Sequence, residues 1–197
     1  MCNEAARRIT LGQLRDDWSQ TRVPLRFPEG APNMAPLDGF RITDSTVIIR
    51  AADAGAEDDA ADLVTRRWSW PGPGGKPVYN FRSDGRTLDK GRCLIPVDCF
   101  FEFTAPADPK QKRKDKWAFR LVDHDWFCIA GLWRANAAVG EAFTMLTCPP
   151  GSDIAPYHGR QVVVLGREDW DRWLDPTVPA AAVCRPLPAG SLLVEPG

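Results

Sequence analysis

Cysteine is the second residue of the chain, and its position makes it a candidate nucleophile. Its side chain is small enough for the initiator methionine to be removed, after which Cys2 carries a free α-amine beside its thiol. The reference pKa of an α-amine is about 7.7–8.0 and that of the thiol about 8.5. Part of the amine is therefore neutral near pH 7 and can form a Schiff base with an aldehyde, on which the thiol can close a five-membered thiazolidine ring. The alternative is a second residue with no catalytic meaning.

Glu102 is a candidate acid or base because of its apolar neighbours. In a strand over residues 99–104, Phe100, Glu102 and Thr104 share one face. A carboxylate among aromatic side chains loses hydration, so its pKa is expected to rise toward the range of a general acid. The alternative is a solvent-facing carboxylate on a half-buried strand.

Two polar segments add further candidates. His158 precedes an apolar run in a loop with proline and glycine, where a histidine can exchange protons near neutral pH, and Arg160 can hold a phosphate with its planar guanidinium. Asn80 offers a hydrogen-bond donor and an acceptor, and Arg82 offers a second phosphate contact. A structural histidine and an ordinary turn are the alternatives. The basic run at 110–116 indicates a solvated hairpin loop, with phosphate contact as the other interpretation.

The overall composition limits the class of protein. The 197 residues suit one domain spanning 1–197, and 25 Lys+Arg against 26 Asp+Glu exclude a general basic coat for DNA binding. Since no apolar run approaches the roughly 20 residues of a membrane span and the N-terminus is polar, we expect neither a membrane segment nor a signal peptide. We expect a cytoplasmic monomer.

The cysteines and tryptophans carry separate information. The six cysteines form no CxxC motif and the two histidines lack zinc-finger spacing, so no structural metal is expected and most thiols should be reduced core residues. The eight tryptophans favour a core built on large aromatics, with a surface for stacking bases as the alternative.

The elements that must position these residues can be predicted from patterns. Leu11, Leu14 and Trp18 behind Thr10 predict an amphipathic helix. Strands are predicted at 46–50 and 63–70, a proline-rich loop at 22–40 and an exposed acidic loop at 51–62. Further strands are predicted within 92–104, 117–122, 126–132, 141–147 and 162–165, followed by a short helix at about 167–174. Adjacent strands with few helices between them favour an α+β fold, a single domain with a mostly antiparallel sheet or small barrel and flanking helices.

The order of the segments resembles the SRAP family, the SOS-response-associated peptidases that shield abasic sites in single-stranded DNA. The matching segments are Met-Cys at 1–2, PNMAP at 32–36, RWSWP at 67–71, NFR at 80–82, RCLIP at 92–96, FEF at 101–103, AGLW at 130–133, APYHGR at 155–160 and EDW with WL within 168–174.

The resemblance implies a role for each catalytic candidate. Processed Cys2 would form the thiazolidine with the ring-opened sugar aldehyde of an abasic site, and Asn80 would hold Cys2 and the opened sugar. Glu102 would orient or deprotonate the amine, and His158 would shuttle protons. The resemblance also implies release of the leading residue, without a metal or other cofactor.

The resemblance implies DNA contacts as well. Arg82 and Arg160 would bind flanking phosphates, and Trp68 would pack against a base or the sugar. Two departures from the family pattern concern DNA affinity or the histidine loop: Asn3-Glu4 replaces the commoner Gly-Arg, and Gln161-Val162 replaces Met-Pro. Phe103 replaces a tryptophan but remains aromatic. A carboxylate at position 4 in place of a cation is expected to weaken DNA binding.

Two other functions remain open from the residues. One is an N-terminal-nucleophile peptidase that acts on peptides. The other is a non-enzymatic module that binds single strands through Trp68, Trp70, Arg82 and the 110–116 run.

Overall fold

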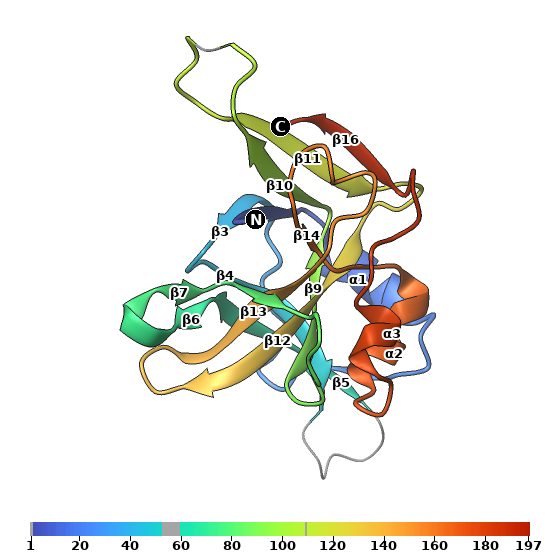
Figure 1. Cartoon of the computed structure of the whole chain (residues 1–197). Coiled ribbons are helices and arrows are strands. Elements are labelled where there is room, and N and C mark those ends of the chain that lie inside the picture. The colour runs from blue at the N-terminus through green and yellow to red at the C-terminus, as the bar shows by residue number, and fades with distance from the viewer. Residues whose placement is uncertain (1, 53–59, 109) are drawn as a thin grey trace.

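A small barrel lies at the centre of the computed structural model, which describes residues 2–52, 60–108 and 110–197 (Figure 1). Its strands are, in order around the ring, β9 (Arg92–Val97), β12 (Phe127–Asn136), β13 (Gly140–Cys148), β5 (Ala61–Trp68) and β4 (Ser45–Ala51). The β13–β5 pair is parallel and closes the ring, whereas the other four pairs are antiparallel. Shorter strands extend the barrel: β8 (Asn80–Arg82) and β14 (Gln161–Val162) on β13, β15 (Val164–Leu165) on β12, and β2 (Leu25–Arg26) on β5.

A second sheet of five strands contains the N-terminal strand. Its order is β16 (Leu192–Pro196), β11 (Asp115–Leu121), β10 (Cys99–Thr104), β1 (Glu4–Arg7) and β3 (Leu37–Arg41). β1 pairs antiparallel with both β10 and β3, so it is an interior strand rather than an edge. A two-stranded ribbon joins β6 (Trp70–Pro71) to β7 (Pro77–Val78), with a 3-10 turn at Pro73–Gly75 between them.

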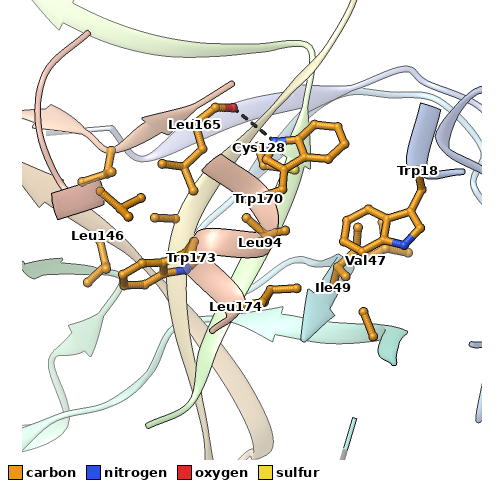
Figure 2. Close-up of a cluster of buried hydrophobic side chains, with 14 of the residues drawn as sticks. Trp18, Val47, Ile49, Leu94, Cys128, Leu146, Leu165, Trp170, Trp173 and Leu174 are labelled. Carbon is orange, nitrogen blue, oxygen red and sulfur yellow. Dashed lines mark hydrogen bonds between the residues drawn. The ribbon is translucent and has the colours of Figure 1, made fainter. Parts of the chain in front are cut away.

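The helices cover the outside of the barrel. α1 (Leu11–Trp18) begins behind a capping box in which Thr10 and Gln13 bond reciprocally. A 3-10 turn at Arg167–Asp169 leads into α2 (Trp170–Leu174), and α3 (Ala180–Val183) follows. The outer cluster of the core joins these helices to the barrel, and Figure 2 shows Trp18, Trp170 and Trp173 over Ile49, Leu94 and Cys128. Trp18 stacks on Trp170 with ring centroids 5.8 Å apart.

Alternation along the strands separates this outer cluster from an inner one. Ile48 lies between Val47 and Ile49 but faces the other way, as Ile129 does between Cys128 and Ala130. The inner cluster fills the barrel and continues onto the five-stranded sheet. Its largest members are Trp68, Phe143, Phe40, Phe100, Phe119 and Phe127.

The predicted fold class is confirmed: the structure is α+β, mostly antiparallel, with a small barrel and flanking helices. The α1 helix and its Thr10 cap are also as predicted. Of the acidic loop predicted at 51–62, residues 53–59 lie outside the described residues, and β5 already begins at Ala61. Of the basic run predicted as a hairpin loop at 110–116, residues 110–114 lie in an exposed loop, whereas Asp115 and Lys116 are the first residues of β11. The loop predicted at 22–40 is interrupted by β2 and runs into β3, so that prediction is wrong in part, and strands β1, β7, β8 and β16 were not predicted either.

Candidate active site

Cys2 lies two residues before the start of β1 and is buried, with 1% of its surface exposed. Its neighbours belong to the inner cluster, which places it between the barrel and the five-stranded sheet. The thiol Sγ donates to the carbonyl of Glu4 at 3.3 Å. Burial, and then the nearby charge of Glu102, raise the pKa of the Cys2 thiol far above its ordinary value. In this state the sulfur is therefore a protonated thiol rather than a thiolate.

Asn80 reaches Cys2 from the barrel. It is the first residue of β8, where the parallel pairing places it opposite Met145 of β13. Its Nδ2 donates to the backbone carbonyl of Cys2 at 2.7 Å. Its Oδ1 is buried without a hydrogen-bond partner among the residues that the structure describes. An unpaired buried oxygen costs folding free energy, and a ligand that donated a hydrogen bond to this oxygen would remove that cost.

Glu102 reaches Cys2 from the other side, on β10. It shares a strand face with Phe100, which belongs to the inner cluster, whereas Phe101 faces the opposite side. Only 1% of Glu102 is exposed, so the interpretation of a solvent-facing carboxylate is wrong. The backbone N–H of Cys2 donates to this carboxylate. Burial raises the pKa of Glu102, and the charge of His158 and the hydrogen bond from Cys2 counter only part of that rise.

His158 completes the group from the loop between β13 and β14. Residues 152–157 form turns, and the His158 N–H donates to the carbonyl of Ile154 at 2.9 Å. The ring Nδ1 lies 3.0 Å from the backbone nitrogen of Arg160 and 2.9 Å from its oxygen. These contacts fix the orientation of the imidazole ring within the loop.

The two arginines of the candidate site differ in their surroundings. Arg82 is exposed at the end of β8, two residues beyond Asn80 and so on the same strand face. Arg160 is more enclosed, because its Nη2 pairs with Asp84 at 2.7 Å and donates to the carbonyl of Thr147 at 2.8 Å. Arg82 is therefore immediately available to a phosphate, whereas Arg160 must share its guanidinium with Asp84.

Trp68 lies inside the barrel, so the prediction that it packs against a base or the sugar of the DNA is wrong. Its exposed fraction is 0%, its ring is parallel to that of Phe143 at a centroid distance of 6.4 Å, and its Nε1 donates to the carbonyl of Tyr79 at 2.8 Å. No surface of the indole is free to stack on a base, so Trp68 is a core residue. Trp70 is also buried.

Two aromatic side chains near the site were not predicted. Trp117 lies opposite Glu102 in the β10–β11 pair, on the same face of the sheet, and Tyr157 directly precedes His158. Their ring centroids are 5.1 Å apart, and both side chains are half-buried. Neither has a sequence signal of its own, and only the register of β11 against β10 connects Trp117 with Glu102.

Glu4, which departs from the family pattern, does not present a free negative charge. Its carboxylate is buried and pairs with Lys116 of β11 at 2.7 Å and with Arg41 of β3 at 3.2 Å. Burial raises the pKa of Glu4, but the hydrogen bonds from Lys116 and Arg41 outweigh it and hold the pKa below its ordinary value. The expected repulsion of phosphate by this carboxylate is therefore largely neutralised inside the protein.

Residues 2–52, 60–108 and 110–197 contain neither a metal-binding cluster nor a membrane-spanning helix. No group of three or more His, Cys, Asp or Glu side chains there is placed to hold a metal ion. No helix in those ranges is long and apolar enough to cross a membrane.

This fold and this arrangement of Cys2, Asn80, Glu102 and His158 define a class of protein. The chain belongs to the SRAP family, SOS response associated peptidase, whose family model matches residues 78–195. Among curated relatives, it is 32% identical over 95 residues to the abasic site processing proteins YobE and YoqW of Bacillus subtilis. That match covers 46% of the chain, and the chain spans only 42% and 41% of the length of these relatives.

Solved structures support the fold over nearly the whole chain. A protein from Bacteroides thetaiotaomicron has a TM-score of 0.73 at 14% identity, covering 99% of this chain and 91% of its own. A phage-related protein from Bordetella bronchiseptica has a TM-score of 0.70 at 20% identity, covering 100% of this chain and 94% of its own.

Proposed function

We propose that the protein processes abasic sites in single-stranded DNA by forming a covalent bond through Cys2. One observation carries the proposal: the backbone nitrogen of Cys2 already donates to Glu102. Removal of Met1 turns this nitrogen into the α-amine, so the reacting amine is created beside an acid whose pKa burial raises. Relatives named abasic site processing proteins supply the substrate class.

The state of the thiol sets the order of the reaction. Because the Cys2 thiol is protonated, the amine attacks first: its nitrogen adds to the sugar aldehyde carbon, and loss of water leaves an imine. The sulfur then adds to the imine carbon as its proton leaves and the nitrogen gains one, which closes the thiazolidine. Glu102 accepts and returns these protons, and His158, whose charge acts on Glu102, relays them.

Asn80 holds the reacting residue during these steps. Its Nδ2 bond fixes the Cys2 carbonyl, and its buried Oδ1 is available to a hydroxyl of the ring-opened sugar. Release of the leading residue is part of the same proposal: water cleaves the Met1–Cys2 amide, giving free methionine and the Cys2 amine. Arg82 and Arg160 bind the phosphates on either side of the sugar.

The test compares two DNA strands that differ only in the aldehyde. Protein whose intact mass shows Cys2 as the first residue is mixed with a single-stranded oligonucleotide containing a natural abasic site or its tetrahydrofuran analogue. We expect an SDS-stable adduct only with the natural site, with the mass of protein plus DNA minus one water. Cys184→Ala, which alters a half-buried thiol outside the site, is the matched control and should keep the full yield.

Substitution of Cys2 distinguishes the bond formed by the amine from the bond formed by the sulfur. Cys2→Ala retains an α-amine but no sulfur, so it should give an adduct only when borohydride reduces the imine. A borohydride-independent adduct with Cys2→Ala would overturn the mechanism. Turnover of peptides without any DNA adduct would support the peptidase alternative, and equal binding of intact and abasic strands without an adduct would support the non-enzymatic module.

A further inference from the structure

The β10–β11 hairpin runs from the candidate active site to a loop that projects beyond the rest of the fold (Figure 1). Glu102 pairs with Trp117, and Thr104 pairs with Asp115 at the last position before the loop. The hairpin therefore connects Glu102 with the exposed loop residues 110–114 through only two further residue pairs.

Trp117 and Tyr157 form an aromatic pair beside Glu102. Of the eight tryptophans, six are buried: Trp18, Trp68, Trp70, Trp126, Trp170 and Trp173. Of the other two, Trp133 has the guanidinium of Arg50 4.0 Å above its ring. Trp117 is thus the half-exposed indole next to the site. Its Nε1 donates to Thr104 Oγ1 at 2.9 Å and Tyr157 packs against Phe119 at 5.3 Å, so both rings are held in place.

Three loop cations, Lys112, Arg113 and Lys114, follow the aromatic pair along the hairpin. All three are exposed, and in the described ranges none forms an ion pair. The nearby Asp115 instead accepts from Ala107 and Gln111. Lys114 is three residues from Trp117, a separation that spans about 10 Å in a strand, and Arg113 and Lys112 lie further along the loop. In a chain with a net charge of −1, this is a local concentration of positive charge.

We propose that this hairpin binds the DNA strand on one side of the abasic site. A flanking nucleobase stacks on the aromatic pair, and the next phosphates bind the three loop cations. An aromatic platform beside a cationic segment suits a single strand, since every base offers a π-face and every linkage a charge. The proposal rests on the proposed function and adds where the flanking strand lies.

The first experiment measures the salt dependence of binding without chemistry. The probe is a single-stranded oligonucleotide with a central tetrahydrofuran analogue, and its dissociation constant is measured by fluorescence anisotropy at several salt concentrations. The logarithm of the association constant falls linearly with the logarithm of the salt concentration, and each phosphate contact contributes about 0.7 to the steepness of that line. The variant Lys112→Ala/Arg113→Ala/Lys114→Ala should therefore make the line less steep by about 2. The control Arg22→Ala/Lys90→Ala/Arg185→Ala removes three exposed charges elsewhere and should leave the slope unchanged. Equal slopes for the two triple variants would overturn the proposal.

The second experiment tests stacking by removing the base from the DNA as well as the ring from the protein. The oligonucleotide carries an additional abasic analogue on the 5′ or the 3′ side of the central one. Wild type should bind one of these two probes about 5- to 150-fold more weakly than the original. Trp117→Leu should bind the original probe with the same reduced affinity, and the additional abasic analogue should not weaken its binding further. Trp117→Phe keeps an aromatic ring and should behave like wild type.

One outcome counts against the aromatic pair. Undiminished sensitivity of Trp117→Leu to the missing base excludes stacking there, and Tyr157→Leu gives the same comparison should Trp117→Leu fail to fold. Failure of the proposed function is seen separately, as absence of an adduct between wild type and the natural abasic site at saturating protein. An adduct with wild type but no effect of the hairpin variants rejects only this inference.

Discussion

The backbone nitrogen of Cys2 is hydrogen-bonded to the carboxylate of Glu102, although the two residues are one hundred positions apart in the chain. The contact exists because β1 is paired with β10, with Ala5 opposite Phe100. The hydrogen bond from Asn80 to the Cys2 carbonyl holds the same residue from the opposite side. The N-terminal segment is therefore positioned by two elements before any substrate arrives.

Asn80→Ala should destabilise the fold and slow adduct formation together. The substitution leaves the Cys2 carbonyl without its donor, and an unpaired buried carbonyl costs about 1–3 kcal/mol. Chemical denaturation measures this loss, and a gel time course with abasic single-stranded DNA measures the rate. Normal stability and a normal rate together would show that the hydrogen bond is dispensable.

Glu102→Gln should stabilise the protein increasingly as the pH rises. Burial raises the pKa of Glu102 in the fold, so above about pH 4.3 the unfolded chain ionises while the folded protein still holds its proton. Wild type then loses stability until the pH passes the folded pKa, and the glutamine variant avoids that loss. The free energy of unfolding, compared between the two at pH 4 and pH 8, checks the sign. The same variant should form the adduct more slowly, because glutamine cannot accept the proton.

Glu4→Gln should have the opposite pH dependence. The pKa of Glu4 is held below its ordinary value by Lys116 and Arg41, so its contribution is present near neutral pH and disappears as the pH falls through the folded pKa. We expect a loss of about 1–3 kcal/mol at pH 7 that shrinks toward pH 3. Asp38→Asn removes a carboxylate that is 89% exposed and should change stability by less than about 0.5 kcal/mol. A larger effect of Asp38→Asn than of Glu4→Gln would contradict this account.

Alkylation of the cysteines should be slow in the native protein. Burial raises the pKa of Cys2 and Cys93 strongly and that of Cys148 and Cys184 to about 12, so little thiolate exists at pH 7.5. Mass spectrometry after treatment with iodoacetamide should find these thiols unmodified until denaturant is added. Rapid native alkylation of Cys2 alone would instead show that its segment opens in solution.

Much of the fold could be predicted from local patterns. Leu11, Leu14 and Trp18 behind Thr10 marked the helix, and the alternation of Cys99, Phe101 and Phe103 against Phe100 and Glu102 gave the two faces of β10 correctly. These elements were predictable because their own side chains carry the period of the helix or strand. Which of the two faces of β10 is buried could not be predicted from the strand itself, since it depends on β1 and the barrel.

Strand β1 was not predicted because two of its four residues are charged yet buried. Glu4 is paired with Lys116 and Arg41. Arg7 donates to the carbonyls of Ile9, Met34 and Ala35. Apart from Ile9, these partners come from distant parts of the chain, so no local pattern distinguishes this strand from an exposed terminus.

The roles of the tryptophans also depended on tertiary contacts. Trp68 fills the barrel because the parallel pairing of β5 with β13 places it opposite Phe143. Trp117 lies at the site because of its register against Glu102. The sequence therefore shows that the chain has eight tryptophans, but it does not show which of them remain exposed to solvent in the fold.

The interior position of β1 has a mechanical consequence. A DNA strand bonded to Cys2 would transmit any pulling force to β1, which is hydrogen-bonded along both edges to β3 and β10. Tension along that strand would load these bonds in shear, so many would have to rupture at once rather than open one after another. A motor that pulled on that strand would therefore have to break the pairing of β1 with β3 and with β10 together before the attached segment left the sheet.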